Sequence, residues 1–166
     1  MSPDRILREG AIRVLVADNS RIHTRLLADA LQRDSVLDVI AFESDSTELV
    51  ATAIAQKIDV LVLSSSLDEQ AMRGFEVLHE LRALHRETRA VLMVGSTDDE
   101  SILKAFRAGA KGLFSKNDAL EMLADCVRSV FQGMVWANSH ALGVAVEALA
   151  RVLVIVDANA DGLRGK

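Results

Sequence analysis

The sequence is poor in cysteine, proline and aromatic residues: its 166 residues include one cysteine, one proline and no tyrosine. With Cys126 alone, the chain can form neither an internal disulfide nor a cysteine-based metal cluster, so a reducing compartment is expected. Cys126 lies in an apolar helical pattern, which favours a small buried side chain over a nucleophile. Residues 1–11 form a polar N-terminal extension without the apolar core of a signal peptide, which predicts a cytoplasmic protein.

Basic residues are in the minority, with 19 Lys and Arg against 24 Asp and Glu, which gives a net charge of -5. This balance argues against broad electrostatic attraction to nucleic acid or to anionic membranes. A glycine-rich phosphate loop is also missing, because the first apolar run is followed by Asp-Asn-Ser-Arg at 18–21. Nucleotide binding is therefore disfavoured, and the four histidines show no paired metal-ligand spacing.

What the sequence does contain is a regular alternation of apolar patterns. Compact apolar runs, typical of buried strands, occupy residues 12–17, 36–42, 60–63, 90–94 and 112–114. Each run is followed by apolar residues at helical spacing, such as Ile22, Leu26 and Leu31 after the first. Asn117 or Asp118 is expected to cap the helix after the last run. This alternation predicts a doubly wound α/β fold, in which helices cover both faces of a five-stranded parallel sheet.

The third apolar run leads directly to Ser64, the residue on which the functional interpretation depends. Loops that leave the carboxyl ends of central parallel strands are where open α/β sheets place their sites. Ser64 could be a reactive group, a substitute for one, or a polar cap on the strand. Ser65 and Ser66 are expected only to hydrogen-bond the loop. The function therefore depends on which groups accompany Ser64.

Three segments and one lysine form a specific set of motifs. They are Val-Leu-Val-Ala-Asp at 14–18, Gly-Phe-Glu-Val-Leu at 74–78, and Ala-Phe-Arg-Ala-Gly-Ala-Lys-Gly at 105–112 with Lys116 four residues further on. With these motifs, residues 12–136 resemble the receiver domains of response regulators of the NarL/LuxR type. The resemblance implies a flavodoxin-like fold, a part in two-component phosphorelay signal transduction and transcription regulation, and a sensor kinase as a possible partner.

The resemblance also implies a set of site residues. In that family an aspartate at the end of strand three accepts a phosphoryl group from a histidine kinase, and two acids after strand one help to hold Mg²⁺. A Ser or Thr after strand four contacts the phosphoryl group, and a lysine after strand five pairs with it. The corresponding residues of this sequence are Ser64 for the acceptor, Asp18 and Asn19 for the acids, Gly95 for the hydroxyl and Lys116 for the lysine. The acceptor, one acid and the hydroxyl are therefore replaced.

Loss of these three groups predicts a degenerate phosphoacceptor site, that is, a pseudo-receiver without catalytic residues. An acyl phosphate requires a carboxylate nucleophile and Mg²⁺ requires hard oxygen ligands, so Mg²⁺ binding is expected to be weak or absent. Lys116 could then bond to Asp18, Ser64 or backbone oxygens. The loop that follows Ser64 is lengthened, and its Asp68 and Glu69 could return a carboxylate to the pocket.

The favoured function is a binding module that acts by phosphorylation-independent protein contacts or by dimerisation. One alternative is a switch in which a serine kinase phosphorylates Ser64. Another is a flavodoxin-like hydrolase with Ser64 as nucleophile, which requires a nearby histidine and a Gly-x-Ser-x-Gly turn. The sequence has no such turn around Ser64, so the chain is not expected to be an enzyme.

The C-terminal extension, residues 137–166, begins with a cap signal at Asn138 or Ser139 and is apolar over most of 141–156. This stretch is shorter than the about 20 apolar residues of a membrane span and contains charged residues, so a transmembrane role is not expected. A helix that is apolar on most sides requires a partner. We therefore expect it to pack on the receiver domain and on a second copy, which gives a homodimer.

Two properties of this extension stay open in the sequence. Residues 151–157 resemble the strand at 13–18, so they could form a strand in place of a helix. In the NarL/LuxR family a DNA-binding helix-turn-helix domain follows the receiver, and nothing in this chain resembles it. Contact with DNA is therefore expected only through an output domain that this chain does not contain.

Overall fold

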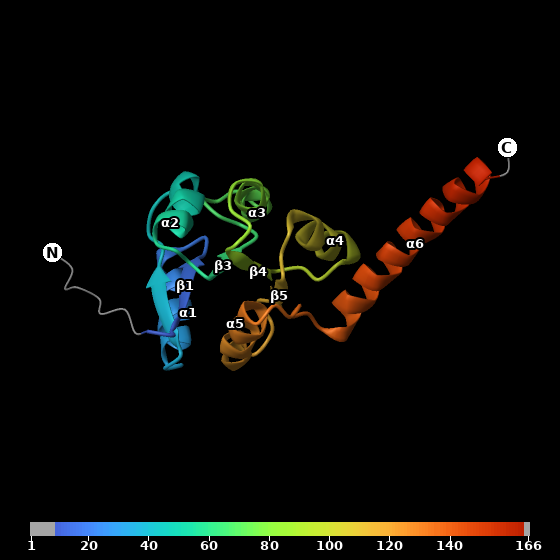
Figure 1. Cartoon of the computed structure of the whole chain (residues 1–166). Helices are drawn as coiled ribbons and strands as arrows, with labels where there is room; N and C mark the ends of the chain where they lie inside the picture. Colours follow the sequence, from blue (N-terminus) through green and yellow to red (C-terminus); the bar gives the residue numbers. More distant parts are fainter. Residues whose placement is uncertain (1–8, 165–166) are drawn as a thin grey trace.

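Residues 9–164 are described by a computed structural model, in which the strands form one parallel sheet (Figure 1). The strands are β1 (Ile12–Ala17), β2 (Leu37–Ala41), β3 (Val60–Ser64), β4 (Arg89–Val94) and β5 (Gly112–Ser115). Their order across the sheet is β2-β1-β3-β4-β5, which is the flavodoxin-like order. The predicted fold is therefore confirmed.

Helices cover both faces of the sheet. They are α1 (Arg21–Gln32), α2 (Leu49–Ala55), α3 (Arg73–Leu84), α4 (Asp99–Ala108), α5 (Leu123–Phe131) and α6 (Ser139–Arg164), with 3-10 turns η1 (Ser46–Glu48) and η2 (Leu120–Met122). Because side chains alternate along a strand, Leu61 and Leu63 of β3 pack with α2, α3 and α4. Val60 and Val62 pack with α1 and α5. β3 is consequently buried on both sides, as its unbroken apolar run indicates.

Side-chain caps and a glycine set the helix ends. The Ser20 hydroxyl accepts a hydrogen bond from the N–H of His23 at 3.1 Å, and the Asp98 carboxylate accepts one from the N–H of Ser101 at 2.7 Å. The hydrogen bonding from Ser101 lowers the pKa of Asp98 below its ordinary value. α4 ends at Gly109, whose φ of 102° is a left-handed conformation that glycine adopts without strain.

α5 begins later than the sequence predicts. Neither Asn117 nor Asp118 caps it, because the Asp118 carboxylate accepts a hydrogen bond from the N–H of Ser115 at 2.9 Å. This bond turns the side chain back toward the end of β5. The helix then starts at Leu123, after the turn η2.

The buried face of α1 also differs from the predicted apolar stripe. Ile22 and Leu26 are exposed. The buried residues are Thr24, Ala28 and Leu31. Thr24 can lie inside because its hydroxyl donates to the carbonyl of Ser20 at 2.9 Å and accepts from the N–H of Asp18 at 3.0 Å. A polar group that is hydrogen-bonded in this way costs little to bury.

α6 is a continuous helix whose Asn138 cap accepts a hydrogen bond from the N–H of Ala141 at 2.8 Å. The helical interpretation of residues 151–157 is confirmed, and the strand alternative is wrong. Ala141 is buried and Val144 is half-buried where α6 meets α4, and the rest of α6 points away from the sheet (Figure 1). No helix among residues 9–164 is long and apolar enough to cross a membrane.

Cys126 is fully buried in α5, as its apolar surroundings in the sequence predict. It packs in the core with Val127 and with Phe114 of β5. Burial, together with a smaller effect of the negative charge of Asp118, raises the pKa of the thiol to about 12. The thiol therefore stays protonated and shielded at neutral pH.

Gly74 allows α3 to begin directly against the end of β3. Its N–H donates to the carbonyl of Ser65 at 2.9 Å. A Cβ at this position would lie 2.7 Å from the Cα of Ser65, and closer still to the carbonyl of Ser64. Because these are backbone atoms, they cannot move aside without shifting the strand end. The contact between α3 and β3 therefore requires glycine.

We predict that Gly74→Ala destabilises the fold by about 3 kcal/mol, the upper part of the usual range for overpacking, because the added Cβ pushes α3 away from β3. Gly95→Ala is the matched control, since nothing lies within 4 Å of a Cβ built there. Its free energy of unfolding should change by less than about 0.5 kcal/mol. Urea unfolding followed by circular dichroism measures both values, and equal midpoints would contradict the close contact.

Candidate functional site

The candidate site lies where β1, β3 and β5 end. Parallel strands present their carboxyl ends at one edge, and the strand order reverses between β1 and β3, where such sheets bind ligands. Asp18 follows β1, Ser64 is the last residue of β3, and Lys116 follows β5. The predicted positions therefore belong to one edge of the sheet, but their side chains do not converge.

Ser64 is closed off from solvent at this edge. Its exposed fraction is 0%, and its hydroxyl accepts a hydrogen bond from the N–H of Ser66 at 3.3 Å. Within the described chain, no histidine or carboxylate is hydrogen-bonded to this hydroxyl. A serine requires a neighbouring base to act as a nucleophile. The contacts of Ser64 are thus those of a strand-end cap.

Asp18 and Asn19 hold backbone atoms. One carboxylate oxygen of Asp18, which is half-buried, accepts a hydrogen bond from the N–H of Asn19 at 2.6 Å. The side-chain oxygen of Asn19 accepts one from the N–H of Glu69 at 2.7 Å. Asn19 therefore connects the loop after β3 to the end of β1. An amide oxygen accepts this hydrogen bond as well as a carboxylate oxygen would.

Lys116 does not reach the other site residues. Its N–H donates to the carbonyl of Val94 at 2.9 Å, while its side chain is exposed. That side chain forms no hydrogen bond or ion pair with any residue in the described range. The possible bond from the Lys116 side chain to Asp18, Ser64 or a backbone oxygen is therefore not formed in this structure, because the side chain lies in solvent.

A hydroxyl is also missing at the end of β4. The strand ends at Val94, which is buried, and Gly95 follows on the surface. The next residue, Ser96, donates its hydroxyl proton to the Asp98 carboxylate at 2.9 Å, where it supports the start of α4. Whether Val94 or Gly95 is compared with the family position, no hydroxyl stands there.

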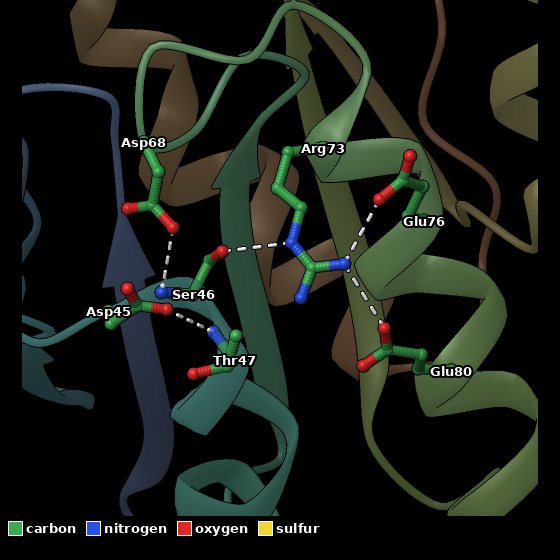
Figure 2. A network of polar contacts seen from close by, with 7 residues as sticks. All are labelled: Asp45, Ser46, Thr47, Asp68, Arg73, Glu76 and Glu80. Carbon is green, nitrogen blue, oxygen red and sulfur yellow. Dashed lines mark hydrogen bonds and ion pairs between the residues drawn. The ribbon is translucent and has the colours of Figure 1, made fainter.

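The lengthened loop 65–72 and the first residue of α3 are fastened to the connection between β2 and α2 (Figure 2). The Asp68 carboxylate accepts a hydrogen bond from the N–H of Ser46 at 3.0 Å. The Ser46 hydroxyl in turn accepts one from Nε of Arg73 at 2.9 Å. Asp68 therefore uses its carboxylate to hold two loops together, beside the end of β3.

Arg73 is the centre of this network, and sequence patterns alone did not single it out. Its side chain is 13% exposed, and its Nη1 lies 3.1 Å from carboxylate oxygens of Glu76 and Glu80 (Figure 2). Burial opposes the positive charge, but the hydrogen bonds that Arg73 donates to these two carboxylates, together with their negative charges, outweigh it and raise the pKa of Arg73. The available sequence signal was two glutamates, three and seven residues later on the same helix face.

A cavity of about 280 Å³ lies beside the end of β1, between the start of α1 and the two fastened loops. The acidic residues in its lining are Asp18, Glu43, Asp45 and Asp68. Hydrogen bonds from Thr47 lower the pKa of Asp45 below its ordinary value. Neither Ser64 nor Lys116 lines this cavity, so it does not bring the family's site positions together.

The oxygen donors at this edge do not fit the Mg²⁺ site that the resemblance implies. Mg²⁺ requires hard oxygen ligands in near-octahedral geometry. Asp18 carries the carboxylate that directly follows β1, and one of its oxygens is already bonded to the N–H of Asn19. The Asp68 carboxylate beside the end of β3 is bonded to the N–H of Ser46. No group of three His, Cys, Asp or Glu residues in the described part of the chain is placed to hold a metal ion.

Comparison with known proteins places this arrangement in a family. Residues 14–128 match the family model of the response regulator receiver domain. The DNA-binding transcriptional activator DevR/DosR of Mycobacterium tuberculosis is 28% identical over 138 residues, which cover 83% of this chain and 63% of that protein. The transcriptional regulatory protein LiaR of Bacillus subtilis is 25% identical over 138 residues, with coverages of 83% and 64%. The chain thus spans about three-fifths of the length of these curated relatives.

A solved structure shows the same fold. The two-component response regulator of the LuxR family from Aurantimonas sp. SI85-9A1 has a TM-score of 0.73 at 20% identity, with 84% of this chain and 99% of that chain covered. The family model covers more than half of the present chain, and the strand order of the sheet is the flavodoxin-like one. The chain therefore belongs to the response regulator receiver domain family, with relatives of the NarL/LuxR type.

Proposed function

We propose that this receiver domain is not switched by phosphoryl transfer at the end of β3 and that it regulates through protein–protein contacts. The observation that carries the proposal is the fully buried hydroxyl of Ser64 where a carboxylate acceptor would stand. An acyl phosphate forms on a carboxylate, and a buried hydroxyl without a base has neither the nucleophilicity nor the access for this reaction.

The cover over Ser64 supports the same proposal. α3 begins against the end of β3 at Gly74, and the loop between them is bonded on one side to Asn19 and on the other to Ser46. A kinase that used Ser64 as a phosphoester acceptor would have to break these contacts before reaching the hydroxyl. The exposed Lys116 and the Asp18 carboxylate, which accepts a hydrogen bond from the N–H of Asn19, add no compensating reactive group.

The proposed partners follow from the exposed surfaces. A second copy of the chain is proposed to bind α6, most of whose apolar residues are exposed. A sensor kinase or another regulatory protein would bind the receiver body in the cytoplasm. DevR/DosR is described as a DNA-binding activator, and the present chain covers 63% of it. Any contact with DNA is therefore assigned to an output domain beyond the residues described.

Incubation with acetyl phosphate and Mg²⁺ tests the proposal. We expect no acid-labile phosphate on the protein, because no carboxylate stands at the end of β3. Intact-mass spectrometry and acid lability of any added phosphate provide the measurement. A receiver domain with an aspartate at this position is the positive control. Stoichiometric acid-labile phosphate would overturn the proposal, and phosphoserine at Ser64 in protein from its own cells would replace it by the serine switch.

We also predict that Arg73→Met destabilises the fold by about 1–3 kcal/mol, because it leaves the buried Ser46 hydroxyl and two carboxylates without their partner. Arg25→Met is the matched control, since Arg25 also forms an ion pair, with Glu43 at 2.5 Å, but its side chain is 67% exposed. The control should leave the unfolding midpoint nearly unchanged. Chemical unfolding compares the two. Equal effects would show that the loop network does not hold the loop closed.

A further inference from the structure

α6 exposes a long apolar surface after it leaves the receiver body (Figure 1). Its exposed large apolar side chains are Leu142, Val146, Leu149, Val152, Leu153, Val154, Ile155 and Val156. The helix has 26 residues and is therefore about 39 Å long. An exposed apolar patch of this kind marks an interaction site on a folded domain.

Part of this surface has a regular spacing. Apolar residues recur at alternating intervals of four and three along α6: Leu142, Val146, Leu149, Leu153, Val156 and Ala160. We call these six residues the α6 seam. An average repeat of 3.5 residues is the heptad pattern that keeps one stripe facing a partner helix in a left-handed coiled coil. Glu147 and Arg151, which form an ion pair at 3.6 Å, lie on the other side of the helix.

The α6 seam is separate from the face that packs on α4. That face carries Ala141, which is buried, and Val144 and Ala148, which are half-buried. At 3.6 residues per turn, the seam is displaced from it by about a third of a turn around the helix axis. α6 can therefore stay packed on α4 of its own chain while the seam binds another helix.

We propose that the α6 seam forms a parallel, two-stranded coiled coil with α6 of a second copy of this chain. The inference rests on the dimer proposed above and specifies its interface, orientation and register. Each seam residue then packs beside the same residue of the second copy, around a twofold axis that runs along the coil.

The composition of the seam favours an identical helix as the partner. A 3.5-residue stripe stays buried along its length when the opposing helix has the same repeat, and a second α6 supplies it. The seam residues carry no charge, so two copies meet without an unpaired buried charge. Val152 flanks the seam and extends its apolar surface.

Charge favours the parallel orientation. His140 Nε2 lies 3.3 Å from Asp99 Oδ1, so α6 starts beside the acidic first turn of α4, which also carries Glu100. In an antiparallel coil that buries the whole seam, the segment with Asp157 and Asp161 of the second copy would lie at this level. Like charges would then approach one another. The parallel coil keeps these two acids at the far end, away from α4.

Sedimentation equilibrium of the full chain at micromolar concentration tests the coil. We expect a dimer, and we expect Leu153→Glu to raise its dissociation constant at least about tenfold, because it buries a charge in the seam. Val154→Glu is the matched control: it adds the same charge at the next residue, which is also exposed but lies outside the seam. Both residues lie beyond the contact with α4, so the unfolding of the receiver body should be unchanged in either variant.

Disulfide crosslinking tests the orientation. Val156→Cys should form a disulfide between two copies under mild oxidation. A parallel coil places this seam residue beside the same residue of the second copy. Val154→Cys is the control and should not crosslink as a preformed pair. The native Cys126 gives no background because it is fully buried. In the antiparallel register, Val156→Cys would crosslink with Val146→Cys in a mixture of the two variants.

Each other outcome overturns a stated part of the inference. A trimer or tetramer excludes the two-stranded coil, and a disulfide confined to the mixture excludes the parallel one. A dimer that survives Leu153→Glu removes the coil but keeps the proposed dimer. A monomeric native chain removes both. None of these results bears on the acetyl phosphate experiment, so the two proposals can fail separately.

Discussion

The hydrogen bonds that fasten loop 65–72 over the end of β3 are the constraint on which the rest of the site depends. Asn19 holds this loop from the side of β1, and Ser46 holds it from the side of β2. Arg73 joins the second contact to α3 through its two glutamates. With Gly74 pressed against the strand end, these bonds leave Ser64 no route to solvent. The loop over β3 is held closed by several hydrogen bonds of moderate strength, because each bond restricts the motion of the residues that form the others.

Under the proposed function, the residues at the family's site positions make structural contacts in this chain. The amide of Asn19 accepts a backbone hydrogen bond as well as an acid would, and it adds no negative charge beside Asp18. Ser64 fills the end of a buried strand without the desolvation penalty of a carboxylate. Lys116, without a phosphoryl group or an acid to pair with, extends into solvent. Under the proposed function these replacements are consistent with one another, since a site without a charged acceptor does not require charged neighbours.

α6 connects this fixed body to a surface that remains available for association. Its first turns belong to the core beside α4, whereas residues 149–162 are exposed. A long isolated helix gains little stability in water from its own backbone bonds, and packing of an apolar face supplies most of the stability of helices in proteins. The α6 seam provides such a face, and its spacing restricts the partners that can cover it.

The sequence by itself determined the order and type of most elements, because apolar periodicity depends on neighbouring residues alone, and it determined that no carboxylate stands at Ser64. It did not determine the start of α5 or the buried face of α1. There Asp118 and Thr24 form hydrogen bonds that the spacing of apolar residues does not predict. Only the tertiary structure decided that Ser64 is covered and that Arg73 meets Ser46. Arg73 begins α3 and Ser46 begins η1, and they come together because the strands that precede them, β3 and β2, lie in one sheet.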